Sequence, residues 1–228
     1  MKIDKVDFFY LSMPVIRDIG DGSQDALLVR IRAGAWEGWG ECEASPLTSI
    51  AAYVCPMSHS ACKPLKYSVE GSDLNNAEDI TRIGRAVQEN SSDLLQAAHT
   101  LSGIDIALWD LLGKKFEEPV YRLLGYKKAH PKLPYASRLF GDSPEATFEK
   151  ARDAKARGYK AVKFGWGSFG KTDLKADEAQ VSAAREGLGS QVQLMIDAGT
   201  VWKEDIAAAR ERLGMLQKMK VFWLEEPF

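Results

Sequence analysis

Several features that mark specialised classes of protein are missing from this 228-residue sequence. No apolar run approaches the ~18 residues that a membrane-spanning helix needs, so no membrane partner is expected. The charge is nearly balanced, with 30 basic and 32 acidic residues, so no nucleic-acid partner is expected either. The start of the chain lacks a signal-peptide core, and the three cysteines are an odd number. These absences predict a reduced, cytoplasmic protein of ordinary globular composition.

The amino-terminal part of the chain combines strands with helices. Strand-like segments joined by turns that contain glycine or aspartate lie at 2–11, 25–33 and 36–44, which predicts an antiparallel meander. From residue 74 to about 116 the apolar residues take helical spacing. Glycine and proline between 125 and 134 interrupt this pattern, and we place a domain boundary near Lys127.

Beyond the boundary, strands and helices alternate. Strands are expected at 133–140, 159–165, 192–199 and 221–227, and helices at 143–158, 175–189 and 203–219. Such alternation predicts parallel strands with helices as right-handed crossovers. A doubly wound sheet and part of a (β/α)8 barrel both fit. The pattern alone slightly favours the open sheet, because four strands cannot close a barrel.

Charged side chains stand at the ends of three successive strands in this alternating part. We expect the second, third and fourth strands to end at Lys163, Asp197 and Glu225. In parallel α/β folds the functional residues gather at the carboxyl ends of the strands, so a lysine and two acids would lie together at this end of the sheet. A buried carboxylate is costly unless it is paired, and Mg²⁺ is the simple partner for two of them. A helix cap or a salt bridge is the alternative for each acid taken singly.

The motifs around these residues resemble the enolase superfamily, in particular its mandelate racemase/muconate lactonizing enzyme branch of acid-sugar enzymes. The stretch "SGIDIALWDLLGKKFEEPVYRLLG" is similar to the end of that family's capping domain, and "GYKAVKFG", "MIDAG" and "WLEEP" resemble its second to fourth barrel strands. The resemblance implies an α+β amino-terminal capping domain at 1–127. It further implies an α/β (β/α) TIM-type barrel at 128–228, of which only about the first half, strands 1 to 4, is present.

The resemblance also implies a chemistry. Asp197 and Glu225 would bind Mg²⁺, and Lys163 would act as a catalytic residue beside the substrate carboxylate. Enzymes of this kind abstract the proton alpha to a carboxylate through a metal-stabilised enediolate. We therefore expect a dehydratase-like lyase that acts on a small-molecule sugar acid. A racemase, an epimerase or a cycloisomerase remains an alternative, as does a non-catalytic fragment.

Two departures from the family pattern qualify this expectation. Many members carry a second lysine two positions after the first, but Gly165 stands there, which weakens a racemase interpretation because racemisation needs groups on both faces of the carbon. A third acidic ligand and a histidine–aspartate pair are also missing. We expect a truncated chain that is inactive alone, and whose exposed sheet edges favour a homo-oligomer or a complementing chain.

The loop between the first two strands is a candidate substrate-binding lid. Its polar residues are Asp18, Asp21, Ser23 and Gln24. In the resembled family this loop closes over the barrel mouth, and a solvated turn is the alternative. Trp166, in the glycine-rich stretch after the second barrel strand, is a further candidate for substrate binding.

A cluster of possible metal ligands lies in "CPMSHSAC", which contains Cys55, His59 and Cys62. Zinc would accept these residue types. Their spacing is not one of the strong zinc patterns, so an adventitious cluster in a capping-domain loop is the favoured interpretation.

Overall fold

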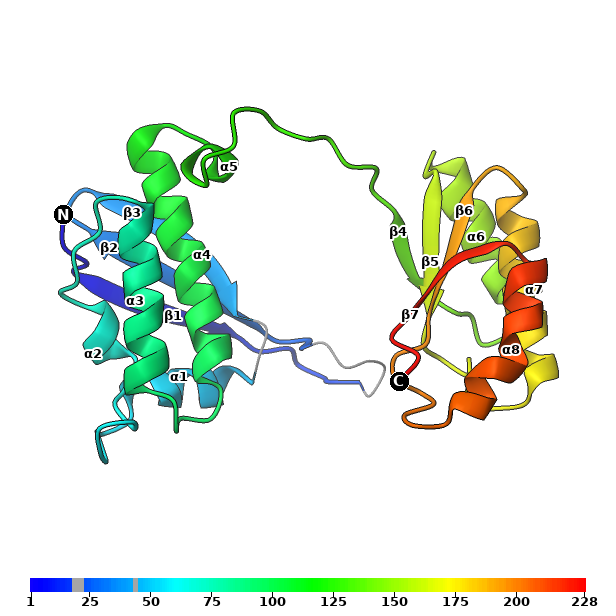
Figure 1. Cartoon of the computed structure of the whole chain (residues 1–228), viewed down its shortest axis with the longest axis horizontal. Helices are drawn as coiled ribbons and strands as arrows, with labels where there is room; N and C mark the ends of the chain where they lie inside the picture. The colour runs from blue at the N-terminus through cyan, green and yellow to red at the C-terminus, as the bar shows by residue number, and fades with distance from the viewer. Residues whose placement is uncertain (18–22, 43–44) are drawn as a thin grey trace. The chain divides into compact units, whose positions relative to one another are not determined.

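The computed structural model describes residues 1–17, 23–42 and 45–228 (Figure 1). It divides into two compact units, Met1–His130 and Pro131–Phe228. The first has a three-stranded antiparallel sheet and the second a four-stranded parallel sheet. The predicted fold class, an α+β unit followed by the first strands of a barrel-like α/β unit, is confirmed. Within the described ranges, no helix is both long and apolar enough to cross a membrane.

The sheet of the first unit is the predicted meander, in the order β1-β2-β3. Its strands are β1 (Lys5–Leu11), β2 (Ala26–Ala33) and β3 (Trp36–Cys42). Alternate residues of β2, from Leu27 to Ala33, are fully buried, because successive side chains of a strand point to opposite faces. The helices of this unit are α1 (Pro46–Val54), α2 (Lys66–Val69), α3 (Ala77–Asn90), α4 (Ala97–Phe116) and α5 (Val120–Leu123).

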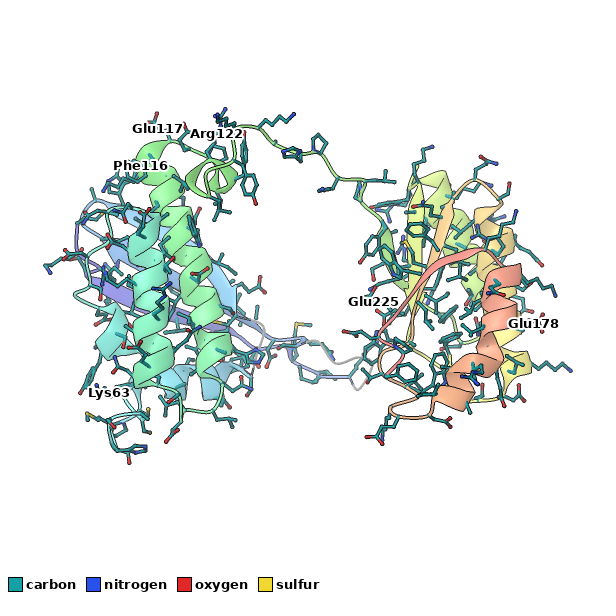
Figure 2. All side chains as sticks on the ribbon, viewed as in Figure 1. Lys63, Phe116, Glu117, Arg122, Glu178 and Glu225 are labelled. Carbon is teal, nitrogen blue, oxygen red and sulfur yellow. The ribbon has the colours of Figure 1, made fainter. Side chains whose placement is uncertain are left out.

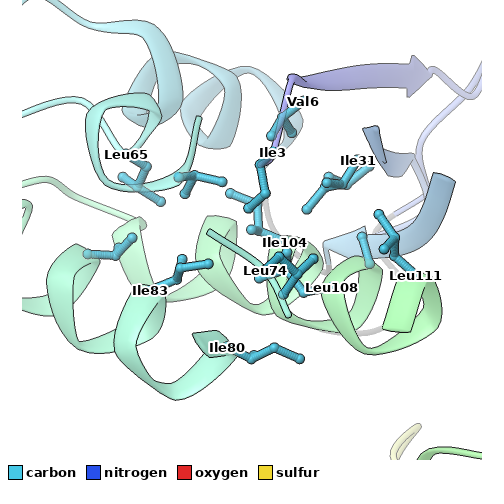
Figure 3. Close-up of a cluster of buried hydrophobic side chains, with 14 of the residues drawn as sticks. Ile3, Val6, Ile31, Leu65, Leu74, Ile80, Ile83, Ile104, Leu108 and Leu111 are labelled. Carbon is cyan, nitrogen blue, oxygen red and sulfur yellow. The ribbon is translucent and has the colours of Figure 1, made fainter. Parts of the chain in front are cut away.

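The core of the first unit lies between this sheet and the helices α3 and α4 (Figure 3). Isoleucine and leucine side chains from both layers fill it, among them Ile31 from the sheet and Ile83 and Leu108 from the helices. Helix α4 approaches β3 closely because glycines face each other there. A Cβ atom added to Gly40 would stand 2.1 Å from the carbonyl oxygen of Gly103, so only glycine fits at position 40.

The second unit follows the predicted alternation. Its elements are β4 (Ala136–Leu139), α6 (Pro144–Ala156), β5 (Ala161–Gly165), α7 (Leu174–Leu188), β6 (Gln193–Asp197), α8 (Ile206–Lys218) and β7 (Val221–Glu225). Local signals begin the helices as expected: Ser143 caps α6 by accepting a hydrogen bond from the Ala146 amide, and Pro144 occupies the first turn.

The strand order β4-β5-β6-β7 follows the chain without a reversal. The helices α6, α7 and α8 consequently lie on one face of the sheet (Figure 1). A doubly wound sheet would reverse its order and carry helices on both faces, so the slight preference of the pattern for that arrangement was wrong. On the helix-covered face, Val162, Phe164 and Ile196 form the core with side chains of the helices.

A buried ion pair fixes the loop after β5 to two helices. Arg212 of α8 donates from Nε to Asp177 Oδ2 of α7 at 2.6 Å, and both side chains are almost fully buried. Asp177 Oδ1 also accepts the Gly170 amide of the loop at 2.9 Å. The Arg212 guanidinium lies over the Trp202 ring, 5.1 Å from its centroid. The loop that begins at Trp166 is therefore held by charge and hydrogen bonds as well as by apolar packing.

Candidate active site

Three charged side chains from neighbouring strands meet on the face of the second sheet that the helices leave uncovered. Lys163 Nζ lies 2.9 Å from Asp197 Oδ2 and 2.6 Å from Glu225 Oε1. The lysine and aspartate side chains are 10% and 11% exposed, and the glutamate is 33% exposed. Figure 2 labels Glu225 at the end of β7. The structure thus brings together the three residues that the sequence singles out.

We expected Lys163 to stand at the end of its strand, but the structure places it before the end. Strand β5 continues two residues further, to Gly165, and Lys163 pairs with Met195 of β6. Gly165, Asp197 and Glu225 share the next level of the sheet. The lysine therefore starts one level below the acids. Its long side chain spans the difference and places the ammonium group between the two carboxylates.

The two carboxylates determine the charge state of Lys163. Burial by itself lowers the pKa of Lys163, but its hydrogen bonds to Glu225 and Asp197 outweigh burial and raise the pKa above the ordinary value for lysine. The ammonium group is charged at neutral pH in this arrangement. Two carboxylates thus already share a single positive charge at this point of the sheet.

The backbone after β6 holds Asp197 in place. Its Oδ1 accepts the Gly199 amide at 3.0 Å, which leaves Oδ2 for the lysine. The Ala198 amide donates to the Glu225 carbonyl at 2.9 Å, so the two acid-bearing strand ends remain joined. Gly199 has a φ of +54°, and a Cβ atom there would stand 3.0 Å from the ring of Trp166. Trp166 therefore covers the loop that positions the aspartate.

Two aromatic residues of the site were missed in the sequence. Trp223 donates from Nε1 to Glu225 Oε2 at 3.2 Å. Its ring meets Tyr135 edge-on at 5.9 Å between centroids, and Lys163 Nζ lies 5.6 Å from the Tyr135 centroid. Strand alternation was the available signal, because Trp223 stands two residues before Glu225 and so shares its face.

Neighbouring atoms leave no space for a side chain at Gly165, where many members of the resembled family carry a second lysine. A Cβ atom on Gly165 would stand 2.6 Å from Asp197 Cβ and 2.8 Å from the Asp197 carbonyl oxygen. Any larger residue there requires a shift of the neighbouring strand. Within this arrangement, no second base can follow Lys163 on the same face of β5.

The donor set is suited to a hard divalent cation. Carboxylate oxygens are the ligands that Mg²⁺ prefers, and the oxygens of Asp197 and Glu225 already converge on one positive centre. Among the described residues, no group of three or more histidine, cysteine, aspartate or glutamate side chains could hold a metal ion. Residues 131–228 also contain no histidine. The two acids would thus supply part of a coordination shell, with water or other groups completing it.

The remaining candidates lie in the first unit or outside the described residues. Asp18 and Asp21 belong to the latter. Ser23 donates to the Asp25 carbonyl at 2.9 Å, and Gln24 exchanges hydrogen bonds with the backbone of Arg17. Ser23 and Gln24 therefore support their own loop in this structure, and their role in substrate binding stays a prediction.

Comparison with known families covers most of the chain. Residues 18–125 match the family described as mandelate racemase/muconate lactonizing enzyme, N-terminal domain. Residues 146–228 match the family described as enolase C-terminal domain-like. The two matches follow each other in the order of the two units, so one relationship accounts for both.

Individual relatives agree with this assignment. A 3,6-anhydro-α-L-galactonate cycloisomerase from Streptomyces coelicolor is 37% identical over 133 residues, which are 58% of this chain and 35% of that protein. An arabinonate dehydratase from Saccharolobus solfataricus is 31% identical over 131 residues, which are 56% of this chain and 33% of that protein. The matched segments thus span about a third of these relatives.

Solved structures match this chain over nearly its full length. The structure described as a predicted mandelate racemase from Rhodobacter sphaeroides is 57% identical, with a TM-score of 0.93, over 100% of this chain and 58% of that chain. A racemase from Streptomyces coelicolor with bound magnesium is 28% identical, with a TM-score of 0.74, over 99% of this chain and 63% of that chain. This chain therefore spans less than two thirds of either protein.

Proposed function

Because this chain belongs to the enolase superfamily, we propose that it carries part of the active site of a Mg²⁺-dependent, dehydratase-like lyase that acts on a sugar acid. Asp197 and Glu225 would be metal ligands, and Lys163 would contact the substrate carboxylate. The observation that carries this proposal is the convergence of two carboxylates from strand ends on one ammonium group of the same parallel sheet, at 2.9 Å or less. The racemase structure with bound magnesium supports the choice of metal.

The residues of the site suit stabilisation of the charge that develops when a proton alpha to a carboxylate is removed. Magnesium, when bound, supplies a positive charge that makes the substrate carbon more acidic. Lys163 would then turn toward the substrate and stabilise the negative charge that develops on the carboxylate oxygens. Trp223 and Gly199 hold the two acids through hydrogen bonds of 3.2 and 3.0 Å, so the acids need little rearrangement.

The local geometry favours elimination over racemisation. Racemisation requires acid/base groups on both faces of the carbon, and Gly165 leaves no room for a basic side chain two residues after Lys163. Loss of water after proton abstraction needs only one face of the carbon and a proton for the leaving hydroxyl. Cycloisomerisation is the second candidate, because it also proceeds from one face and the Streptomyces coelicolor relative carries that name.

The lack of histidine in residues 131–228 limits what the chain does by itself. We propose that it binds magnesium and a sugar acid without completing the reaction. Strand β7 also leaves Phe222 and Trp223 61% and 39% exposed, which supports a homo-oligomer or a complementing chain as partner. We also propose that the protein is located in the cytoplasm.

Calorimetry with a panel of sugar acids tests the proposal. We expect binding that requires magnesium and that is lost in Lys163→Met, because the substrate carboxylate would lose its cationic partner. The exposed Lys171→Met variant is the control. Binding that is equal with and without magnesium would contradict the assignment of the site.

Mass analysis of the same mixtures tests the reaction class. A product lighter by one water would identify elimination, and a product of unchanged mass would indicate an isomerisation, either cycloisomerisation or epimerisation. Either product would overturn the expectation that this chain is inactive alone.

A further inference from the structure

Two cysteines of the first unit lie in neighbouring segments whose backbone is separately anchored. Cys55 directly follows α1, and Cys62 closes a tight hairpin in which the Ser58 amide donates to the Cys62 carbonyl at 3.0 Å. Both residues are partly exposed, and both are free thiols. Lys63, the neighbour of Cys62, is labelled in Figure 2 at the edge of this unit.

A backbone hydrogen bond joins the two segments that carry these cysteines. The Leu65 amide donates to the Ala52 carbonyl at 3.2 Å, so the segment after the hairpin runs back along the end of α1. Cys62 stands three residues before Leu65 and Cys55 three residues after Ala52, so both cysteines lie near this hydrogen bond along the chain. The Cys55 amide is itself fixed by the Ala51 carbonyl at 2.8 Å.

The other side of the hairpin is fixed to the end of α3 and the turn that follows. The Lys63 amide donates to the Asn90 carbonyl at 2.9 Å, and the Asp93 amide donates to the Ala61 carbonyl at 3.1 Å. His59 Nε2 lies 2.8 Å from Asp93 Oδ2. Both flanks of Cys62 are therefore held by the fold.

We propose that Cys55 and Cys62 are an oxidation site that forms a reversible intramolecular disulfide. A peroxide is the oxidant: the two thiols lose two protons and two electrons, one S–S bond forms, and hydrogen peroxide is reduced to two water molecules. A dithiol reductant reverses the reaction and is itself oxidised to a disulfide. The site is independent of the magnesium site proposed above.

The third cysteine differs from this pair in its surroundings. Cys42 is 2% exposed, and burial raises the pKa of its thiol to about 11, so it is poorly reactive. Burial also raises the pKa of Cys55, and the neighbouring Cys62 raises it further, as expected for two adjacent thiols. The pair should therefore oxidise slowly near neutral pH and faster in alkaline solution.

The pair is better suited to a disulfide than to zinc. In the described part of the chain, no set of three or more suitable side chains could hold a metal, and His59 is already engaged with Asp93. A disulfide needs only the two thiols and a fixed backbone separation. It would close the loop 55–62 and reduce the freedom of the unfolded chain, which raises the thermal midpoint of the first unit.

Peroxide treatment of the full chain, followed by alkylation and peptide mass analysis, tests the proposal. We expect one peptide with an internal link between Cys55 and Cys62, with a mass lower by two hydrogens, and we expect this link to disappear after dithiothreitol. The variant Cys42→Ser should form the same link. The variants Cys55→Ser and Cys62→Ser should form none, and neither should change magnesium binding.

Three outcomes would overturn the proposal. They are oxidation of one cysteine to a sulfinic acid without a crosslink, a crosslink that includes Cys42, and dimers joined between chains. A thermal midpoint equal in the oxidised and reduced protein would contradict the predicted effect on stability. Urea unfolding of the serine variants under reducing conditions establishes that they fold before these comparisons are made.

Discussion

Replacing Arg212 with methionine should strongly destabilise the second unit. The change removes the partner of Asp177, whose side chain is 1% exposed, and among the described residues leaves its carboxylate with the Gly170 amide as its remaining hydrogen-bond donor. An unpaired buried charge of this kind costs about 3–5 kcal/mol. The loss of the guanidinium that covers the Trp202 ring adds to this cost.

The same pair of helices contains a matched control. Lys218 of α8 lies 3.1 Å from Glu178 of α7, but these side chains are 69% and 43% exposed. Figure 2 labels Glu178 on the outer side of the helix layer. Because exposed ion pairs contribute about 0–1 kcal/mol, Lys218→Met should change the free energy of unfolding by less than about 1 kcal/mol.

Urea unfolding followed by tryptophan fluorescence measures both variants, with Trp202 as the local reporter. The double variant Asp177→Leu/Arg212→Met should recover much of the stability that Arg212→Met loses, because no buried charge remains. Equal losses for Arg212→Met and Lys218→Met would refute the reasoning. A double variant no more stable than Arg212→Met would show that packing, not charge, explains the loss.

Three other changes have defined outcomes. Gly40→Ala should destabilise the first unit by about 1–3 kcal/mol in urea unfolding, because the added Cβ would stand 2.1 Å from a backbone oxygen. The control Gly84→Ala in α3 adds a Cβ to open space and should stabilise the unit by about 0.5–1 kcal/mol. The pKa of Asp7 is held below 3.8 mainly by its hydrogen bond to Lys5, so the contribution of Asp7 to folding stability is present above that pH and lost below it. Between about pH 5 and 3, Asp7→Asn should therefore lose less stability than the parent in unfolding titrations. Parallel curves for the two proteins would contradict this. Trp223→Phe keeps a ring but removes the N–H donated to a proposed metal ligand, and should weaken magnesium binding about tenfold in calorimetry; unchanged affinity would exclude a positioning role.

The alternation of strands and helices in the second unit was predictable because each element carries its own local signals. Caps and prolines mark the helices, and the apolar residues of β5 and β6 mark two buried strands. The face on which the helices lie was not predictable, since an open sheet and a barrel share those signals. Helix α1 was missed because it has only nine residues and its Ser45 cap makes no side-chain hydrogen bond. Its stability comes from burying residues such as Tyr53 in the core.

The site was predictable in its residues and less so in its geometry. The position of Asp197 and Glu225 at strand ends followed from the pattern, but the level of Lys163 depends on a register that only strand pairing fixes. The buried pair of Asp177 and Arg212 could not be foreseen, because a charged residue in a helix is usually on the surface.

Magnesium titration of the full chain by calorimetry tests the central claim most directly. Binding should be lost in Asp197→Asn and in Glu225→Gln, because each removes one of the two converging carboxylates, while the exposed Glu178→Gln should bind as the parent does. If both site variants bound magnesium as tightly as the parent, or if the parent bound none, the proposed metal site would be wrong.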